Sequence, residues 1–293
     1  VVPNKKLRCS NPKHEAGGGG INVSRAIKRL GGESLAIFTC GGPNGDILKE
    51  KLEQENVQYQ PIVIKDNTRE NITIFESNSH QQFRFIMPGP DLSEDECDQV
   101  LDQLQGLEPQ PDFLVVSGST PGGIESNYYE KIIDIAKDME CKVIVDTSGK
   151  YLKQAGQTGV YLLKPNMREL SNLAESSIEG EASQIEAARS IVDSGQAEVV
   201  VVSLGAGGAL LVTQDENEQL RTPTVTIRSK LGAGDSMVAG IVLKLAQGES
   251  IRDATLYGLA AGAATVSTEG TELCSKSDTD HLYQRLKQDQ KES

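Results

Sequence analysis

The sequence has little of what metal centres and disulfide frameworks require. Its 293 residues include no Trp, three His and five Cys, and aromatic residues make up only 4% of the chain. The histidines lie far apart, at positions 14, 80 and 281, and no Cys-x-x-C occurs, so a structural zinc site is not expected. The odd number of dispersed cysteines with hydrophobic neighbours favours reduced, buried thiols and a cytoplasmic protein.

Long apolar runs and an excess of positive charge are also missing. No run approaches the ~18 residues that a membrane-spanning helix needs. The 29 basic and 42 acidic residues give a net charge of −13, and this charge repels nucleic acid and anionic membranes. We therefore expect neither as a partner. An anionic small substrate stays open, because a helix N-terminus or a local group of cations can reverse the sign of the field.

Strand-like apolar runs alternate with helical segments along most of the chain, which predicts one large α/β domain with a parallel sheet. The predicted interior strands are Ser34 to Cys40, Asp112 to Val116, Lys142 to Asp146, Val160 to Lys164 and Glu198 to Leu204. The predicted helices include Gly45 to Glu55, Ser93 to Leu104, Asn127 to Lys137 and Ile185 to Ser194, with Ser93 and Asn127 as N-caps, and three more follow in the C-terminal half.

One segment breaks this alternation. Residues Gln60 to Met87 form two or three alternating strand patterns, with turn formers at Asn78 and Ser79. We expect an antiparallel hairpin there, inserted in the domain as a small β lid. A hairpin of this size exposes apolar side chains and is marginal alone, so we expect it to pair with another subunit in a homodimer.

A run of four glycines, Gly17 to Gly20, leads into a helical segment that begins near Asn22. Glycines let the backbone approach a ligand closely, and the helix offers the positive end of its dipole. The Asn22 carboxamide has a donor and an acceptor for sugar hydroxyls. A simple flexible turn before a helix is the alternative.

A second motif is Gly232-Ala233-Gly234-Asp235, which precedes an apolar helical stretch. Its backbone N–H groups can hold the negative charge that develops on a transferring phosphoryl group, and Asp235 can accept a hydroxyl proton. Alternatively, Asp235 only caps the helix. The spacing fits neither a dinucleotide fingerprint nor a P-loop.

Two further motifs follow apolar strands. In Lys164-Pro-Asn166-x-x-Glu169, an Asn and a Glu three residues apart can face one site and hold hydrated Mg²⁺, although an exposed polar helix face gives the same pattern. The strand ending at Ser203 runs into the glycine turn Gly205 to Gly208, which suits nucleotide phosphates or ribose but has low specificity.

Together, in this order and separation, these motifs resemble the ribokinase-like (PfkB) family of sugar kinases over essentially the whole chain. The resemblance implies a single ribokinase-like domain over 1–293, a three-layer α/β/α sandwich with a mostly parallel central sheet and a β lid from about 1–16 and 60–88. Family members begin with a strand and an Asp that binds sugar hydroxyls. The chain opens Val-Val-Pro after that point, without an initiator Met or a secretory leader, so we expect that the natural N-terminus lies upstream.

The resemblance also implies roles for the motif residues in phosphoryl transfer from Mg²⁺-bound ATP to a primary hydroxyl. Asp235 is the general base, and the N–H groups of Gly232, Ala233 and Gly234 form the anion hole. The implied substrate-binding residues are Gly17, Gly18, Asn22, Asp235, Arg69 and Lys6. The implied nucleotide-binding residues are Lys164, Asn166, Ser203, Gly205, Gly208, Gly232 and Gly234, and the implied Mg²⁺ residues are Asn166 and Glu169. The resemblance leaves a monovalent cation open, because Thr268, Glu269 and Glu272 depart from the pattern of close relatives in the loop expected to hold it.

Within the family, five stretches are similar to the minor-type bacterial 6-phosphofructokinases, which phosphorylate fructose 6-phosphate at C1. These stretches are Lys6 to Cys9, Gly17 to Val23, Phe83 to Gly89, Val201 to Gly205 and Gly270 to Cys274. Gly19 supports this subfamily, because 1-phosphofructokinases and tagatose-6-phosphate kinases typically carry Lys at that position. Kinases of those two kinds are the alternatives in the same family. A catalytically silent regulator that binds a sugar phosphate or a nucleotide is the alternative of another class.

Overall fold

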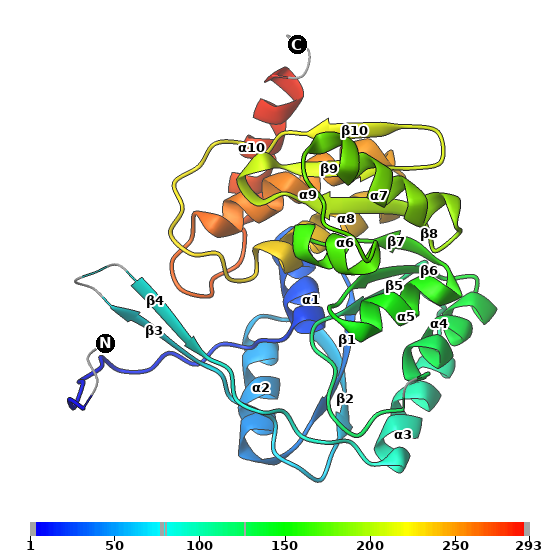
Figure 1. The fold of residues 1–293 in the computed structure, drawn as a ribbon. Coiled ribbons are helices and arrows are strands. Elements are labelled where there is room, and N and C mark those ends of the chain that lie inside the picture. The colour runs from blue at the N-terminus through cyan, green and yellow to red at the C-terminus, as the bar shows by residue number, and fades with distance from the viewer. Residues whose placement is uncertain (1–3, 77–78, 80, 126, 290–293) are drawn as a thin grey trace.

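A six-stranded sheet forms the centre of the computed structural model, which describes residues 4–76, 79, 81–125 and 127–289 (Figure 1). The strand order is β10-β9-β8-β7-β6-β5, with β5 to β8 parallel and β9 antiparallel to both of its neighbours. The six strands are β5 (Phe113–Ser117), β6 (Lys142–Asp146), β7 (Val160–Leu163), β8 (Ala197–Ser203), β9 (Ala209–Val212) and β10 (Asn217–Leu220). The predicted mostly parallel sheet is confirmed.

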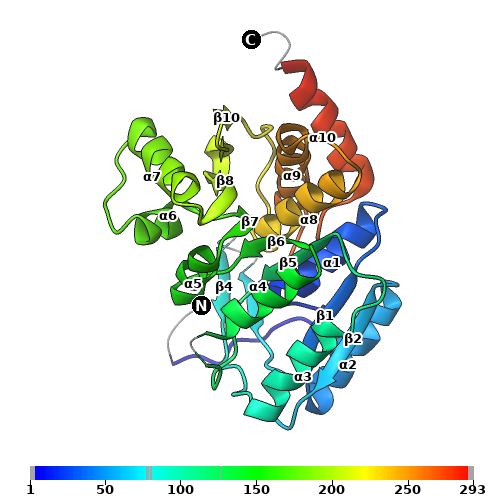
Figure 2. The same ribbon diagram turned by 90° about the vertical axis from the view of Figure 1, so that its right-hand side faces the viewer.

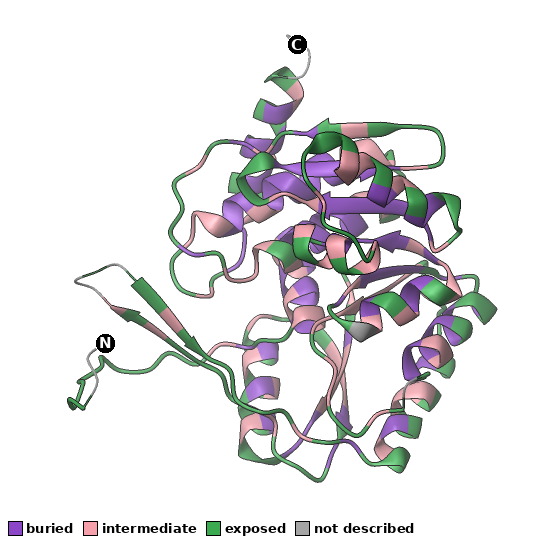
Figure 3. Cartoon of the chain, viewed as in Figure 1, coloured by how far each residue is buried: buried purple, intermediate pink, exposed green. Residues whose placement is uncertain are grey.

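Helices cover both faces of this sheet (Figure 2). On one face pack α1 (Gly19–Arg29), α8 (Ala233–Ala246) and α9 (Ile251–Val266), and α10 (Lys276–Asp289) joins the same core against α9. On the other pack α4 (Tyr128–Asp138), α5 (Lys150–Thr158), α6 (Met167–Leu173) and α7 (Glu181–Asp193), and α3 (Glu94–Gln105) joins this core against α4. Val199 and Val201 of β8 join the first core and Val200 and Val202 the second, because successive strand residues point to opposite faces. Buried residues therefore concentrate in the middle of the three-layer α/β/α sandwich (Figure 3).

The prediction that Ser34 to Cys40 lies inside the main sheet is wrong. Within the described residues, β1 (Leu35–Cys40) pairs only with β2 (Gln58–Val63), in a separate parallel two-stranded sheet. Helix α1 packs against both β1 and β5, while α2 (Gly42–Gln54) connects β1 to β2. An apolar run predicts that a strand forms, but it does not specify which strand lies beside it, because that partner can be distant in sequence.

The hairpin of the predicted lid is confirmed. Strands β3 (Ile72–Glu76) and β4 (Gln81–Phe85) are antiparallel and extend away from the body beside the N-terminal segment (Figure 1). The predicted turn residue Asn78 lies outside the described residues. The lid is smaller than expected: β2 belongs to the body, where Ile62 is buried, and the described part of 1–16 contains no strand.

Local signals explain where some helices begin. Ser93 caps α3 as predicted, in a reciprocal capping box with Glu96. Asn127 stands at the N-cap of α4, but its side chain accepts no hydrogen bond from the helix, so the predicted cap is wrong in that respect. Helix α2 begins three residues before the predicted Gly45, and Pro43 lies in its first turn, where a missing N–H costs nothing.

Four of the five cysteines are buried and all five are free thiols, whereas Cys9 is exposed in the N-terminal segment, contrary to the expectation that all are buried. Among the described residues, no helix is both long and apolar enough to cross a membrane.

Candidate active site

Polar residues gather where four neighbouring parallel strands end. Strand β5 ends at Ser117, β6 at Asp146 and β8 at Ser203, while β7 leads directly into Lys164. The register places Ser117 opposite Asp146, and a bridge joins Asn166 to Ser203. Open α/β sheets bind ligands beyond the carboxyl ends of their strands, so this edge is the expected place for a site.

Two helices direct their first turns at the same edge. Gly232 adopts a left-handed conformation with φ of 72° at the N-cap of α8, and this places Asp235 in the first turn of that helix. Asn22, near the start of α1, donates from Nδ2 to Asp235 Oδ2 at 2.8 Å, across 213 residues of sequence. The structure therefore brings together the predicted sugar ligand and the predicted general base.

The surroundings of Asp235 shift its proton affinity. Burial raises the pKa of this carboxyl from 3.8 to about 6, and the hydrogen bond from Asn22 opposes that rise. The negative charge of Asp146 raises the pKa further, while the positive charges of Lys164 and Arg84 lower it. The result is a carboxylate that is ionised at neutral pH and has an affinity for protons suited to a general base.

We expect turnover to depend on the ionised form of Asp235. Because its pKa is about 6, kcat/KM should be constant near pH 8 and fall about tenfold for each pH unit well below 6. Steady-state rates between pH 5 and 9 at constant ionic strength test this. An acid limb centred near pH 4, where an unperturbed carboxyl titrates, would contradict it.

Lys164 and Asp146 form a buried ion pair at the sheet edge. Lys164 Nζ lies 3.0 Å from Asp146 Oδ1, and the side chains are 6% and 15% exposed. A β-carbon placed on Gly234 would lie 3.7 Å from the same Nζ, so the lysine also reaches the first turn of α8. The N–H groups of that turn have no intrahelical partners and can bind an anion.

A cleft of about 180 Å³ lies between these groups. It is lined by Ser117, Gly118, Asp146, Thr147, Ser148, Glu169 and Asp235. The glycine loop closes against it, because a β-carbon on Gly19 would come within 2.6 Å of the backbone of Gly118. Gly19 is therefore required for the close packing of the loop on the end of β5.

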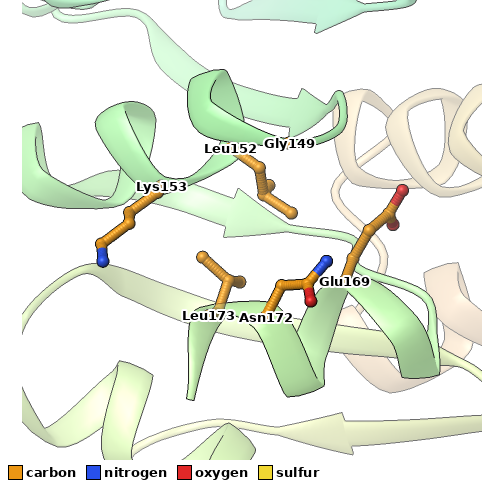
Figure 4. Close-up of a pocket in the computed structure, with 6 residues that line it drawn as sticks. All are labelled: Gly149, Leu152, Lys153, Glu169, Asn172 and Leu173. Atoms are coloured by element: carbon orange, nitrogen blue, oxygen red, sulfur yellow. The ribbon is translucent and has the colours of Figure 1, made fainter. Parts of the chain in front are cut away.

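Asn166 and Glu169 form a capping box at the start of α6. Asn166 Oδ1 accepts from the Glu169 backbone N–H at 3.0 Å, and Glu169 Oε2 accepts from the Asn166 N–H at 2.8 Å. Glu169 also borders a second pocket of about 250 Å³, where Leu152 and Leu173 face each other (Figure 4). The capping alternative is thus present in the structure, and the metal role of these two residues stays a prediction.

The donor set at the cleft fits Mg²⁺ bound together with phosphates. Among the residues that the structure describes, no three His, Cys, Asp or Glu side chains cluster closely enough to hold a metal. Mg²⁺ usually binds one or two carboxylates and completes its shell with water and substrate phosphates. Glu169 and Asp146, which both line the cleft, are suited to that arrangement.

The remaining motif residues have more local roles in the structure. The Ser203 backbone N–H donates to the Pro165 carbonyl at 2.9 Å, which joins the third and fourth motifs. Gly205 is exposed with φ of 60° and open space around it, and its role in nucleotide binding stays a prediction. At Gly208 a β-carbon would lie 1.9 Å from the Leu220 carbonyl oxygen, so this glycine is needed for strand packing.

The predicted substrate cations do not line the cleft. Arg69 donates to Ser119 Oγ at 2.5 Å, near the end of β5, whereas Lys6 is exposed and no contact within the described chain connects it to the cleft. Gly17 and Gly18 precede α1, with Gly18 at its N-cap.

Sequence reasoning missed Asp146 and Arg84, although Asp146 ends a predicted strand at the edge where the other motifs end.

The fold and the site together define a ribokinase-like kinase. A family model described as pfkB family carbohydrate kinase matches residues 2–278, and the chain belongs to this family. It is 42% identical over 287 residues to the ATP-dependent 6-phosphofructokinase isozyme 2 of Escherichia coli strain K12, covering 98% of this chain and 93% of that protein. It is 32% identical over 267 residues to the 1-phosphofructokinase of Bacillus subtilis strain 168, covering 90% and 86% respectively.

The crystal structure of phosphofructokinase-2 from Escherichia coli in complex with fructose-6-phosphate has a TM-score of 0.93 to this chain, at 42% identity and with 98% and 93% of the two chains covered. A structure of the same protein in complex with potassium has a TM-score of 0.94.

Proposed function

We propose that this protein is an ATP-dependent 6-phosphofructokinase, which transfers the γ-phosphoryl group of ATP to the C1 hydroxyl of fructose 6-phosphate. The observation that carries the proposal is the contact of Asn22 with Asp235 at the N-terminus of α8, on the ligand-binding edge of the sheet. The 42% identity to a 6-phosphofructokinase, against 32% to a 1-phosphofructokinase, supports the choice of substrate.

In this reaction Asp235 accepts the proton of the C1 hydroxyl. The C1 oxygen then bonds to the γ-phosphorus while the bond from that phosphorus to the β,γ-bridging oxygen breaks, and ADP leaves with the released electron pair. The N–H groups at the start of α8 and the ammonium of Lys164 stabilise the charge on the transferring group. Glu169 and Asp146 would hold Mg²⁺, directly or through water, and the ion would supply positive charge to the ATP phosphates.

The glycine loop also supports fructose 6-phosphate over the other two substrates. Kinases for tagatose 6-phosphate and fructose 1-phosphate typically carry Lys where this chain has Gly19. Here a β-carbon at Gly19 would lie 2.6 Å from Ser117 Oγ as well as from the Gly118 backbone, so a side chain would force the loop to move.

The test is ADP release with Mg²⁺-bound ATP and, separately, fructose 6-phosphate, tagatose 6-phosphate and fructose 1-phosphate. We expect the highest kcat/KM with fructose 6-phosphate. A preference for either other sugar phosphate would reassign the substrate. Binding of ATP and sugar phosphate without turnover would instead support the silent regulator.

We further propose a homodimer through the lid. Ile72 and Phe85 are directly opposite in the hairpin register, so they share a face, and each is 45% exposed. We expect the protein to sediment as a dimer at micromolar concentration and the double variant Ile72→Lys/Phe85→Lys to sediment as a monomer. Ile227→Lys, at an apolar residue that is 58% exposed outside the lid, is the control and should remain dimeric. A monomeric native protein would contradict the proposal.

A potassium requirement and a cytoplasmic location stay predictions. In this chain Glu269, in the loop expected to hold a monovalent cation, pairs with Arg228 at 2.9 Å on the surface.

A further inference from the structure

Arg25 is a buried cation that the proposed mechanism does not use. Arg25 lies in α1, three residues after Asn22, and only 2% of its surface is exposed. Nε and Nη2 donate to the two oxygens of Glu55 at 2.9 and 2.5 Å, so this end of the guanidinium is neutralised by a bidentate ion pair. Nη1 donates to the Ala16 carbonyl oxygen at 2.5 Å and to Asn22 Oδ1 at 3.2 Å.

These bonds determine which way the Asn22 carboxamide faces. A guanidinium has donors and no acceptor, so the Asn22 atom beside it must be the oxygen. The amide nitrogen then points to the opposite side, where it donates to Asp235 Oδ2 at 2.8 Å. An ionised carboxylate has only acceptors, so the two ends of the carboxamide require the same orientation.

We propose that Arg25 is a positioning residue for phosphoryl transfer: by holding Asn22 Oδ1, it keeps the Asn22 N–H directed at Asp235 and so favours the ionised, correctly aimed carboxylate. This inference rests on the proposed role of Asp235 as general base. Without Arg25, the carboxamide is free to rotate by half a turn. Its oxygen then accepts a hydrogen bond from the protonated form of Asp235, which stabilises the wrong protonation state.

The other groups around Asp235 do not belong to this chain of contacts. Asp146 approaches from the end of β6, Lys164 from the end of β7 and Arg84 from β4, and all three influence the Asp235 carboxyl through their charges. Arg25 acts through Asn22, which lies on the same helix, α1. A change at Arg25 therefore leaves those three charges in place.

The test compares the acid limb of the kcat/KM profile in Arg25→Met and in Glu55→Gln. Arg25→Met removes the donor to Asn22, and we expect the midpoint of the limb to rise by about one pH unit, because the bond that favours the charged form is lost. Glu55→Gln changes the charge of the same ion pair by one but keeps the contact of Arg25 with Asn22, so its midpoint should stay within a few tenths of the native value. A lower kcat/KM at every pH with an unmoved midpoint in Arg25→Met would overturn the proposal.

Arg25→Lys covers the case in which the methionine variant does not fold. It keeps the buried charge, but one ammonium cannot reach Glu55, the Ala16 carbonyl and Asn22 together, so we expect a smaller rise of the midpoint in the same direction. An unmoved midpoint in a folded Arg25→Lys protein whose kcat/KM is lowered at every pH would contradict a positioning role.

A second readout does not depend on turnover. The ¹⁵N–¹H signals of the Asn22 carboxamide, assigned by their loss in Asn22→Ser, should move with pH as Asp235 titrates. In Arg25→Met we expect that movement to occur at higher pH than in the native protein. If native protein lacks kinase activity but its Asn22 signals respond to Arg25→Met in this way, the proposed function fails, and only the part of the inference in which Arg25 orients Asn22 toward Asp235 stands. If Asp235→Asn abolishes turnover while Arg25→Met moves neither midpoint nor signals, the positioning role fails.

Discussion

Replacing Asp235 by Asn should lower kcat by about 10²- to 10⁴-fold, because the variant cannot accept the proton of the C1 hydroxyl. The carboxamide has nearly the size of the carboxylate, so binding of ATP and fructose 6-phosphate should change little. Single-turnover rates and equilibrium binding with the same preparation separate the two effects. Asp134→Asn is the matched control, because Asp134 is exposed on α4, and it should keep the native rate.

This substitution should not cost stability at neutral pH. The pKa of Asp235 is raised in the folded protein, from 3.8 to about 6, so between these values the folded state binds more protons than the unfolded state. The group therefore destabilises the folded protein above about pH 6, and this destabilisation is lost as the pH falls toward 3.8. A neutral Asn removes this penalty, and the thermal midpoint at pH 8 should be no lower than that of the native protein. Retention of most of the activity would show that Asp235 is not the base.

Replacing Lys164 by Met should have the second large effect, and it should act on stability and on turnover. The substitution leaves the Asp146 carboxylate without its partner in a buried place, and breaking such a pair costs about 3–5 kcal/mol. It also removes a positive charge beside Gly234, where the loss of one stabilising group typically costs about 10²- to 10³-fold in kcat. Urea unfolding and steady-state kinetics measure the two losses.

The double variant Lys164→Met/Asp146→Asn separates these two effects. With the unpaired charge at position 146 removed, most of the lost stability should return, while turnover should stay low. Lys153→Met is the control, because Lys153 pairs with Glu175 at the surface and such pairs contribute about 0–1 kcal/mol. Full recovery of turnover in the double variant would contradict a role of Lys164 in stabilising the transferring phosphoryl group.

The parts of the site that the sequence predicts are those whose chemistry lies in contiguous motifs. Gly232 and Asp235 stand together at a helix start, and Asn166 and Glu169 fall at the spacing of a single helical turn. Their arrangement follows from short-range geometry. The strands that end at Ser117 and Ser203 were also predictable, because buried parallel strands are continuous apolar runs.

The remainder depends on contacts between distant segments. Arg84 lowers the pKa of Asp235 only because the fold brings the hairpin near that carboxyl, and no local pattern specifies that placement. Arg25 looks like an ordinary helical cation until the fold brings Glu55 to it. The separation of β1 from the main sheet has the same origin, because its periodicity indicates a strand but not the strand beside it.

The most direct test of the account is the ³¹P NMR spectrum of native protein incubated with Mg²⁺, ATP and fructose 6-phosphate, beside an identical sample of Asp235→Asn. We predict that native protein converts the γ-phosphate signal into a second sugar-phosphate monoester signal, that of fructose 1,6-bisphosphate, in step with the appearance of ADP. Asp235→Asn should leave the spectrum nearly unchanged over the same time. ATP loss that yields inorganic phosphate, or equal product formation by both proteins, would contradict phosphoryl transfer to the sugar with Asp235 as its base.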